Sequence, residues 1–270
     1  MAPIKQLVVL RRKAGLTKDE YFDYHYQKHG AISTAPTAAE TPGKYFQTHF
    51  VDAAYHADTS QNVPNAHPPW AFSDGVTELY FDSSEHLMRV FQSEWVSKKV
   101  GPDGVNFSDF SAVLPMFVRE DAVPLPFTRA SGMDQQAENT FVAMYFVALR
   151  DPEIPSETLI SELVSSLACH ASTEVQSMLV NVPVDSGFDL GAYFGGEPPV
   201  RYRLVFTMIL RGRSSIKTIR NAQADFEAKI TSLDLPATWI AFGERAVVLD
   251  QAGNVKFDVS RQPFKNSKFD

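Results

Sequence analysis

The same order of predicted elements occurs twice along this chain. Apolar runs predict strands, apolar residues at helical spacing predict helices, and the first half follows the order strand, helix, strand, strand, helix, strand at residues 6–12, 17–30, 44–53, 75–81, 84–98 and 112–119. After a polar connector the order returns at residues 140–149, 155–170, 174–182, 201–210, 214–230 and 238–249. Such a repeat favours an architecture in which one unit pairs with a second copy of itself.

Each βαββαβ unit is typical of a ferredoxin-like α+β fold, an antiparallel sheet with both helices on one face. The other face needs a cover, and residues 45–50 carry no formal charge on either parity, as expected for a strand covered on both sides. We therefore predict two tandem ferredoxin-like domains, residues 1–130 and 131–270, whose paired sheets form an intramolecular barrel with an internal cavity. Because the duplication lies within one chain, we expect a monomer or a homodimer.

Composition limits the function classes. The 270-residue chain is 44% hydrophobic, which is enough for a buried core, and its net charge of −7 makes nucleic acid and anionic membranes unlikely partners by repulsion. The single cysteine, Cys169, excludes an intramolecular disulfide. The longest apolar run, residues 141–149, is about half of what spans a bilayer. The N-terminus lacks a signal-peptide pattern, so we expect a cytoplasmic protein.

Three segments carry a family resemblance: residues 15–30 (GLTKDEYFDYHYQKHG), 74–83 (DGVTELYFDS) and 106–109 (NFSD). They resemble the EthD domain of the dimeric α+β barrel superfamily, in the tandem form found in fungal secondary metabolism. The resemblance covers about residues 6–118, whereas the second half is similar in fold only. It implies that the first half holds the chemistry. Relatives are described as dehydratases or cyclases of polyketides, and superfamily members include cofactor-free monooxygenases and heme enzymes.

Two histidines lie one turn apart near the end of the first predicted helix. His29 stands at the helix C-terminus, where an imidazole can act as an acid or base near neutral pH; the alternative is a helix cap. It matches the most recognisable histidine of the resembled family. His25 lies on the same side of the helix, but no third ligand is suggested nearby, so no metal is predicted. We predict a catalytic role for His29 and a substrate-binding role for His25.

Glu78 lies in the middle of the strand at residues 75–81, on the parity of Tyr80. On a sheet covered on both faces this carboxyl group is buried, and burial favours either the neutral acid or a pairing with a cation or an imidazole. The structural alternative is a salt bridge to Arg11 or Arg12. We predict Glu78 as a catalytic residue and Tyr80 as a substrate-binding residue.

His49 lies on the neighbouring strand and shares its parity with Tyr45. If His49, Glu78 and His29 converge, they supply an acid, a base and an orienting partner without a cofactor. We predict His49 as the third catalytic residue and Tyr45 as a substrate-binding residue of the same cavity.

Two more aromatic residues are predicted to bind substrate. Trp70 belongs to a loop of about twenty residues that also holds His56 and His67, a set suited to covering a cavity, although Trp70 as a hydrophobic plug is the equal alternative. Phe107 lies in the segment that follows the second helix and is expected to plug the mouth of the barrel.

These features predict a cofactor-independent enzyme of secondary metabolism that binds a small molecule, either a polyketide or an aromatic compound. The expected reaction is dehydration or cyclisation, in which His29 or His49 removes a proton next to a carbonyl group and protonated Glu78 or the other imidazole assists the departure of water. Two alternatives stay open: a cofactor-free monooxygenase of an anthrone-like phenol, and a non-catalytic small-molecule or heme-binding barrel. The sequence has no P-loop, dinucleotide-binding or GxSxG motif.

Overall fold

Each half of the chain forms one four-stranded antiparallel sheet. This computed structural model describes residues 3–34, 37–127, 140–151, 153–196 and 198–264. The first sheet has the spatial order β4-β1-β3-β2 and the second has the order β8-β5-β7-β6, the same order unit by unit. The strands are β1 (Ile4–Leu10), β2 (Lys44–Tyr55), β3 (Gly75–Phe81), β4 (Leu114–Val123), β5 (Thr140–Val147), β6 (Val175–Pro183), β7 (Leu204–Leu210) and β8 (Trp239–Asp250).

Two seams join the sheets into a closed barrel, because β2 pairs with β8 and β4 pairs with β6. The β2–β8 seam is close: a Cβ atom added at Gly243 would lie 2.2 Å from the carbonyl oxygen of His49. Only glycine fits this approach without moving a strand. The prediction of tandem ferredoxin-like units that form an intramolecular dimeric α+β barrel is therefore confirmed.

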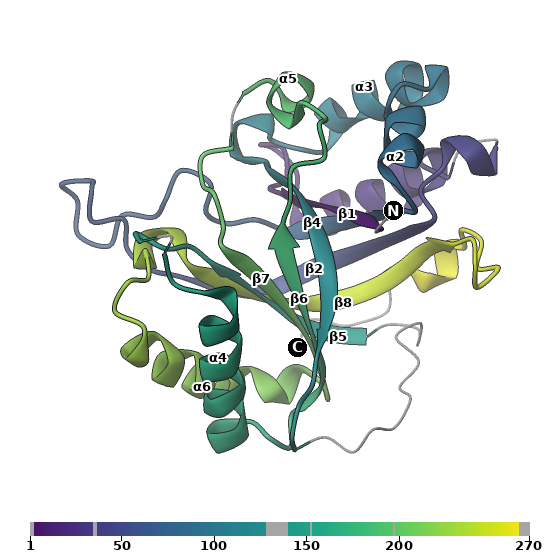
Figure 1. Cartoon of the computed structure of the whole chain (residues 1–270). Coiled ribbons are helices and arrows are strands. Elements are labelled where there is room, and N and C mark those ends of the chain that lie inside the picture. The colour runs from purple at the N-terminus through teal and green to yellow at the C-terminus, as the bar shows by residue number, and fades with distance from the viewer. Residues whose placement is uncertain (1–2, 35–36, 128–139, 152, 197, 265–270) are drawn as a thin grey trace.

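Helices cover the outside of the barrel, and those of the two halves lie on different sides of it (Figure 1). In the second half α4 (Ser156–His170) and α6 (Ile216–Lys229) are regular α-helices that lie side by side. In the first half the predicted helices are shorter and irregular. They are α1 (Lys18–Asp23) continued by the π-helix η1 (Tyr24–Gly30), and α2 (Ser84–Phe91) followed by the π-helix η3 (Val96–Val100) and α3 (Gly101–Asp103).

A short helix, α5 (Leu190–Phe194), was not predicted from the sequence. It lies in the connection between β6 and β7, and this connection brings it to the top of the molecule beside α3 (Figure 1). A segment of the second half thus lies against the helices of the first half.

Apolar side chains from seven of the eight described strands, all but β6, meet in the barrel interior, and Leu7, Val76 and Val142 are each fully buried there. From the sequence, the cavity of the first half was expected between the two sheets. The hollow of the first half lies instead on the outer face of its sheet, beneath the helices. The boundary predicted at residue 130 lies outside the described residues. Within the described parts of the chain, every helix is too short or too polar to cross a bilayer.

Candidate active site

A cavity of about 420 Å³ lies between the outer face of the first sheet and the helices of the first half. Its floor is the sheet, through residues such as Val8, Tyr45 and Thr77. Its walls are the π-helix η1, which contributes His29, and residues 90–110. Most of the lining is apolar, so the cavity suits a largely apolar ligand that meets a few polar groups.

Local sequence explains why η1 carries its histidines to this wall. Thr17 caps α1 and exchanges hydrogen bonds with Glu20, as the predicted capping box requires. The helix then widens into the π-helix η1, a feature that is frequent at functional sites. The imidazole rings of His25 and His29 lie 6.1 Å apart between centroids, on the same side of the helix as predicted.

His29 forms a hydrogen-bonded pair with Asp103. Its Nδ1 lies 2.9 Å from Asp103 Oδ2, while Asp103 Oδ1 accepts hydrogen bonds from the Tyr24 hydroxyl at 2.8 Å and from the Asn106 amide at 3.0 Å. Burial alone would raise the pKa of Asp103, but these hydrogen bonds outweigh it and lower the pKa, so the group is a carboxylate. A carboxylate on Nδ1 keeps the proton there and leaves Nε2 of the neutral ring as a base.

Asp103 is a candidate site residue that was assigned no role from the sequence, although it stands three residues before Asn106 of the family segment. It lies in α3, more than seventy residues from His29 along the chain. Only the folding of residues 90–110 over the cavity brings the two together. The sequence offered one signal for this pairing, namely a carboxylate just before the family segment at residues 106–109.

His25 is completely buried behind the cavity wall. Its Nε2 lies 3.0 Å from the hydroxyl of Thr77, which lines the cavity, and its ring stacks on Phe107 at 5.2 Å. Burial and the nearby imidazoles of His49 and His29 hold the pKa of His25 well below its usual value, so the ring is neutral. His25 therefore reaches the cavity through Thr77 and Phe107.

His49 is also completely buried. Its side chain leaves β2 on the face of the sheet that the helix of His25 covers. Its ring stacks on Phe22 at 4.3 Å, and its Nε2 lies 3.2 Å from the side-chain oxygen of Gln47. Burial lowers the pKa of His49 to about 3, which keeps the ring neutral at physiological pH. The ring of His25 lies between the rings of His49 and His29. Its centroid is 5.5 Å from that of His49 and 6.1 Å from that of His29.

Glu78 does not join the histidines. In the register of β2 and β3, Gln47 faces Thr77 and Phe46 faces Glu78, so the parity that carries Glu78 points into the barrel and the parity of His49 points to the helices. The expected convergence of His29, His49 and Glu78 is therefore not what the structure shows. The sheet itself stands between the acid and the imidazoles.

Inside the barrel Glu78 is ionised and paired. Its carboxylate lies 2.7 Å from Lys5 Nζ and 3.7 Å from Arg245 Nη1. Burial alone would raise the pKa of Glu78, but the charges of Lys5 and Arg245 outweigh it and lower the pKa. The predicted mechanism required a protonated Glu78, but the structure shows an ionised Glu78. The cations that pair with it are Lys5 and Arg245, not Arg11 or Arg12.

Tyr80 shares this buried network. Its hydroxyl donates to Glu120 at 3.0 Å, and Lys5 Nζ lies 5.0 Å from the centre of its ring. Its parity points into the barrel, as that of Glu78 does. The structure therefore places Tyr80 away from the cavity in which a substrate was expected to meet it.

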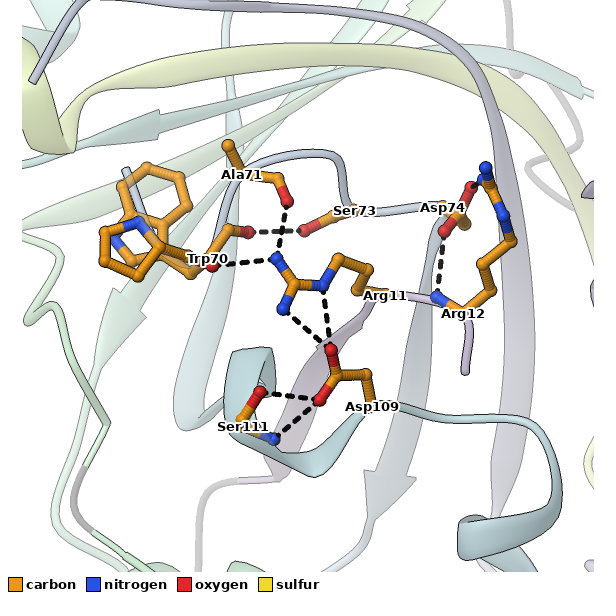
Figure 2. A network of polar contacts seen from close by, with 9 residues as sticks. Arg11, Arg12, Trp70, Ala71, Ser73, Asp74, Asp109 and Ser111 are labelled. Carbon is orange, nitrogen blue, oxygen red and sulfur yellow. Dashed lines mark hydrogen bonds and ion pairs between the residues drawn. The ribbon is translucent and has the colours of Figure 1, made fainter. Parts of the chain in front are cut away.

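Trp70 is a plug of the barrel end, which was the alternative to its substrate-binding role. It is 4% exposed and packs in the interior cluster, with its ring 5.8 Å from that of Trp239. Arg11 holds this loop in place by donating to the carbonyl groups of Pro69 at 2.7 Å and Ala71 at 3.2 Å (Figure 2). Among the described residues, Trp70 does not line the cavity of His29.

Arg11 and Arg12, which were the predicted alternative partners of Glu78, bind other carboxylates. Their contacts hold together the chain segments at one end of the barrel. Arg11 forms two hydrogen bonds with Asp109, and Arg12 pairs with Asp74, whose carboxylate also accepts from the Arg12 backbone at 2.8 Å (Figure 2). Asp74, which opens the Asp-Gly segment of the family, is buried by this pairing. Its role in the structure is to join β3 to the end of β1.

The other loop histidines and Phe107 also have clear positions. His56 reaches across to the second half, where its Nε2 lies 3.1 Å from Glu227 of α6, and His67 packs 4.6 Å from the exposed ring of Phe72. Neither covers the cavity. Phe107 does line it, 4.7 Å from the ring of His29, instead of plugging the barrel mouth.

The second half contributes to the cavity through α5. Tyr193 and Phe194 line it, and Phe194 lies 6.3 Å from the ring of Phe110 on the opposite segment. Three polar atoms of the lining, Gln6 Nε2, Ser33 Oγ and Ser108 Oγ, are buried and have no hydrogen-bond partner in the described structure. Buried polar atoms without partners are costly, so these mark places where a ligand can supply hydrogen bonds.

The fold and this lining define a small-molecule cavity in an α+β barrel. Residues 13–111 match the model of the EthD domain. This matched segment is the part of the chain assigned to the EthD family, and it contains both His29 and Asp103.

The search of curated proteins finds no match. Among solved structures, the chain is similar to an anthrone oxidase-like protein, with a TM-score of 0.56, 6% identity and coverage of 93% of this chain and 95% of that chain. A protein from Fusobacterium nucleatum that is assigned as a monooxygenase has a TM-score of 0.48 at 8% identity, with 92% and 93% covered. Chlorite dismutase from Candidatus Nitrospira defluvii has a TM-score of 0.43 at 7% identity, with 89% and 90% covered. At 6% identity, the similarity to the anthrone oxidase-like protein shows a shared fold alone.

Proposed function

We propose that this protein is an enzyme that binds an oxygenated, mostly apolar small molecule in the first-half cavity and transfers a proton there through His29. The observation that carries the proposal is the His29–Asp103 pair, 2.9 Å apart, opening onto an apolar cavity of about 420 Å³. A base that is oriented by a carboxylate and faces a mostly apolar cavity is suited to removing a proton from carbon.

The reaction we propose first is dehydration or cyclisation of a polyketide-like or aromatic substrate. His29 Nε2 takes a proton from the carbon next to a carbonyl group, and the electron pair forms an enolate. In dehydration the hydroxyl group on the next carbon then leaves with a proton as water, so no oxidant is required. Typical acid–base assistance of this kind contributes about 10²- to 10⁴-fold to a rate.

Oxygenation of an anthrone is the second candidate, and the fold shared with an anthrone oxidase-like protein favours it. In that reaction His29 deprotonates the anthrone, and the resulting carbanion reacts with molecular oxygen. One oxygen molecule is consumed for each methylene group converted to a carbonyl group, with release of water. Oxygen uptake therefore separates the two reactions.

The test supplies the purified protein with an anthrone and, separately, with an aromatic β-hydroxyketone, and records product formation and oxygen uptake. His29→Ala should reduce turnover of the accepted substrate by about a hundredfold or more. His170→Ala is the matched control, because His170 ends the corresponding helix α4 of the second half without lining the cavity. Unchanged turnover in a folded His29→Ala protein would rule out the assignment.

The remaining parts of the proposal concern the two halves. We propose that residues 1–130 carry the chemistry and that residues 131–270 complete the barrel and supply the cavity wall at Tyr193 and Phe194. The lining does not require a second copy of the chain, and a cytoplasmic monomer or homodimer remains the expectation.

A further inference from the structure

Strand β2 presents a hydrogen-bonded line of side chains behind the cavity: Tyr45, Gln47 and His49, all completely buried. The side-chain oxygen of Gln47 lies 3.2 Å from His49 Nε2. Its amide nitrogen donates to the carbonyl oxygen of His25 at 2.8 Å and also to the hydroxyl oxygen of Tyr45. Every polar atom of the Gln47 side chain therefore has a partner.

The orientation of the Gln47 amide follows from these partners. Turning it over would set its oxygen against the carbonyl oxygen of His25, where two acceptors would face each other. The neutral ring of His49 supplies the matching donor on the other side of the amide. Gln47 must therefore act as a donor toward Tyr45.

A tyrosine oxygen that already accepts a hydrogen bond has its own hydrogen left to donate. Tyr45 lines the cavity, and the hydroxyls of Ser33 and Thr77, which also line it, are among the polar groups near its oxygen. The Gln6 amide nitrogen lies in the same lining without a partner in the described structure. A ligand oxygen that enters here meets a set of donors.

We propose that Tyr45 donates the hydrogen bond that stabilises the negative oxygen formed when His29 removes a proton, and that Gln47 is the positioning residue that directs the Tyr45 hydrogen to the ligand. This inference rests on the proposed function. The proton moves from substrate carbon to His29 Nε2, the electron pair moves to the substrate oxygen, and the Tyr45 hydrogen stays on its oxygen as a hydrogen-bond donor. Such a donor acts on the charge that develops in the transition state.

Burial raises the pKa of Tyr45 above its ordinary value, which keeps the hydroxyl protonated at working pH. This agrees with a role as a donor and disfavours one as a base. His29, with its carboxylate partner, is the group equipped to accept the proton.

The test uses a nitro-substituted naphthol as a probe, because its visible absorption distinguishes bound phenolate from bound phenol. A hydrogen bond to a charged oxygen is worth about 1.5–3 kcal/mol, so Tyr45→Phe should weaken phenolate binding by about ten- to a hundredfold. The corresponding nitronaphthalene, which lacks the hydroxyl group, should bind both proteins equally. Tyr202→Phe is the matched control, since this buried tyrosine accepts from Trp239 in the barrel interior.

Gln47→Glu tests the positioning role. A carboxylate at this place would accept the Tyr45 hydrogen and turn it away from the cavity, so phenolate binding should fall as far as in Tyr45→Phe. Gln47→Met, which neither donates nor accepts strongly, should give a smaller loss. If Tyr45→Phe does not fold, as judged by circular dichroism, the two Gln47 variants decide the question.

The outcomes separate the two proposals. If the probe binds and Tyr45→Phe holds the phenolate as tightly as the unaltered protein, the inference is overturned and the proposed function stands. An equal loss for naphthol and nitronaphthalene would also overturn it, because Tyr45 would then only shape the cavity. If neither compound binds the unaltered protein, the proposed function fails and the inference fails with it.

Discussion

The two halves of the molecule share one sheet topology but differ in how helices cover the sheet. In the second half α4 and α6, of 15 and 14 residues, lie as regular helices on the sheet, and Leu163, Ile219 and Phe226 fill the space between. In the first half, short α-helices give way to π-helices, and a cavity of about 420 Å³ stays open. The difference shows that the helical layer, not the sheet, decides which half has a cavity beneath its helices.

The connections between the middle strands differ in the same way. The β2–β3 connection of the first half sends Trp70 into the barrel interior, where it packs near Trp239. The β6–β7 connection of the second half sends α5 over the cavity, where Tyr193 and Phe194 complete the lining. Each half therefore supplies a piece that the other lacks, and the cavity belongs to the first half with a wall from the second.

The largest expected effect concerns the shared barrel interior. Glu78→Gln removes the carboxylate between Lys5 and Arg245, and breaking a buried ion pair in this way costs about 3–5 kcal/mol of unfolding free energy. Urea denaturation measures this cost. Asp121→Asn, in the exposed pair with Arg119, is the control and should cost less than about 1 kcal/mol.

Ligand binding by Glu78→Gln decides whether the barrel interior is separate from the cavity. Because the sheet stands between Glu78 and His29, folded Glu78→Gln protein should bind the naphthol probe as the unaltered protein does. A folded variant that no longer binds the probe would show that the two regions are not independent.

The second effect compares one substitution in the filled half and in the hollow half. Leu163→Ala should cost about 2–5 kcal/mol, because Leu163 is 1% exposed in a filled core. Leu79→Ala should lower the unfolding free energy by roughly half of that or less. Leu79 already borders the cavity, so its truncation enlarges an existing space and creates no new one. Urea denaturation of both proteins gives the two costs, and equal losses would contradict the difference between the halves.

The smallest effect is the acid sensitivity of the first half. The folded pKa of His49 is about 3, below its unfolded value of about 6.5, so its contribution to stability is complete above pH 6.5 and is lost as the pH falls from there toward 3. Each pH unit in that window costs about 1.4 kcal/mol for one such histidine.

His49→Gln removes this titration. Unfolding free energies at pH 6.5 and pH 5 should fall less steeply in the variant, by about 1.4 kcal/mol per pH unit. His170→Gln, at an exposed position on α4, is the control for the exchange of a histidine for glutamine. A slope that His49→Gln leaves unchanged would mean that His49 is not buried as a neutral ring.

Several features of the site could be predicted from local sequence. The capping box at Thr17 and Glu20 set the start of the helix, and helical spacing placed His25 and His29 on one side of it. Strand alternation correctly predicted that Glu78 and Tyr80 lie on one face of the sheet and that Thr77 and Leu79 lie on the other. It could not say which parity faces the interior, because both faces of this sheet are covered and neither parity of β2 at residues 45–50 is charged.

The sequence by itself determined the repeated element order, the barrel that follows from it, and the helix that carries His29, since these depend on spacing along one segment. The tertiary structure decided that Glu78 meets Lys5 and Arg245, that Asp103 orients His29, and that α5 closes the cavity. These contacts join residues far apart in the chain. Their partners are selected by strand register and by the path of the connections, which no local pattern encodes.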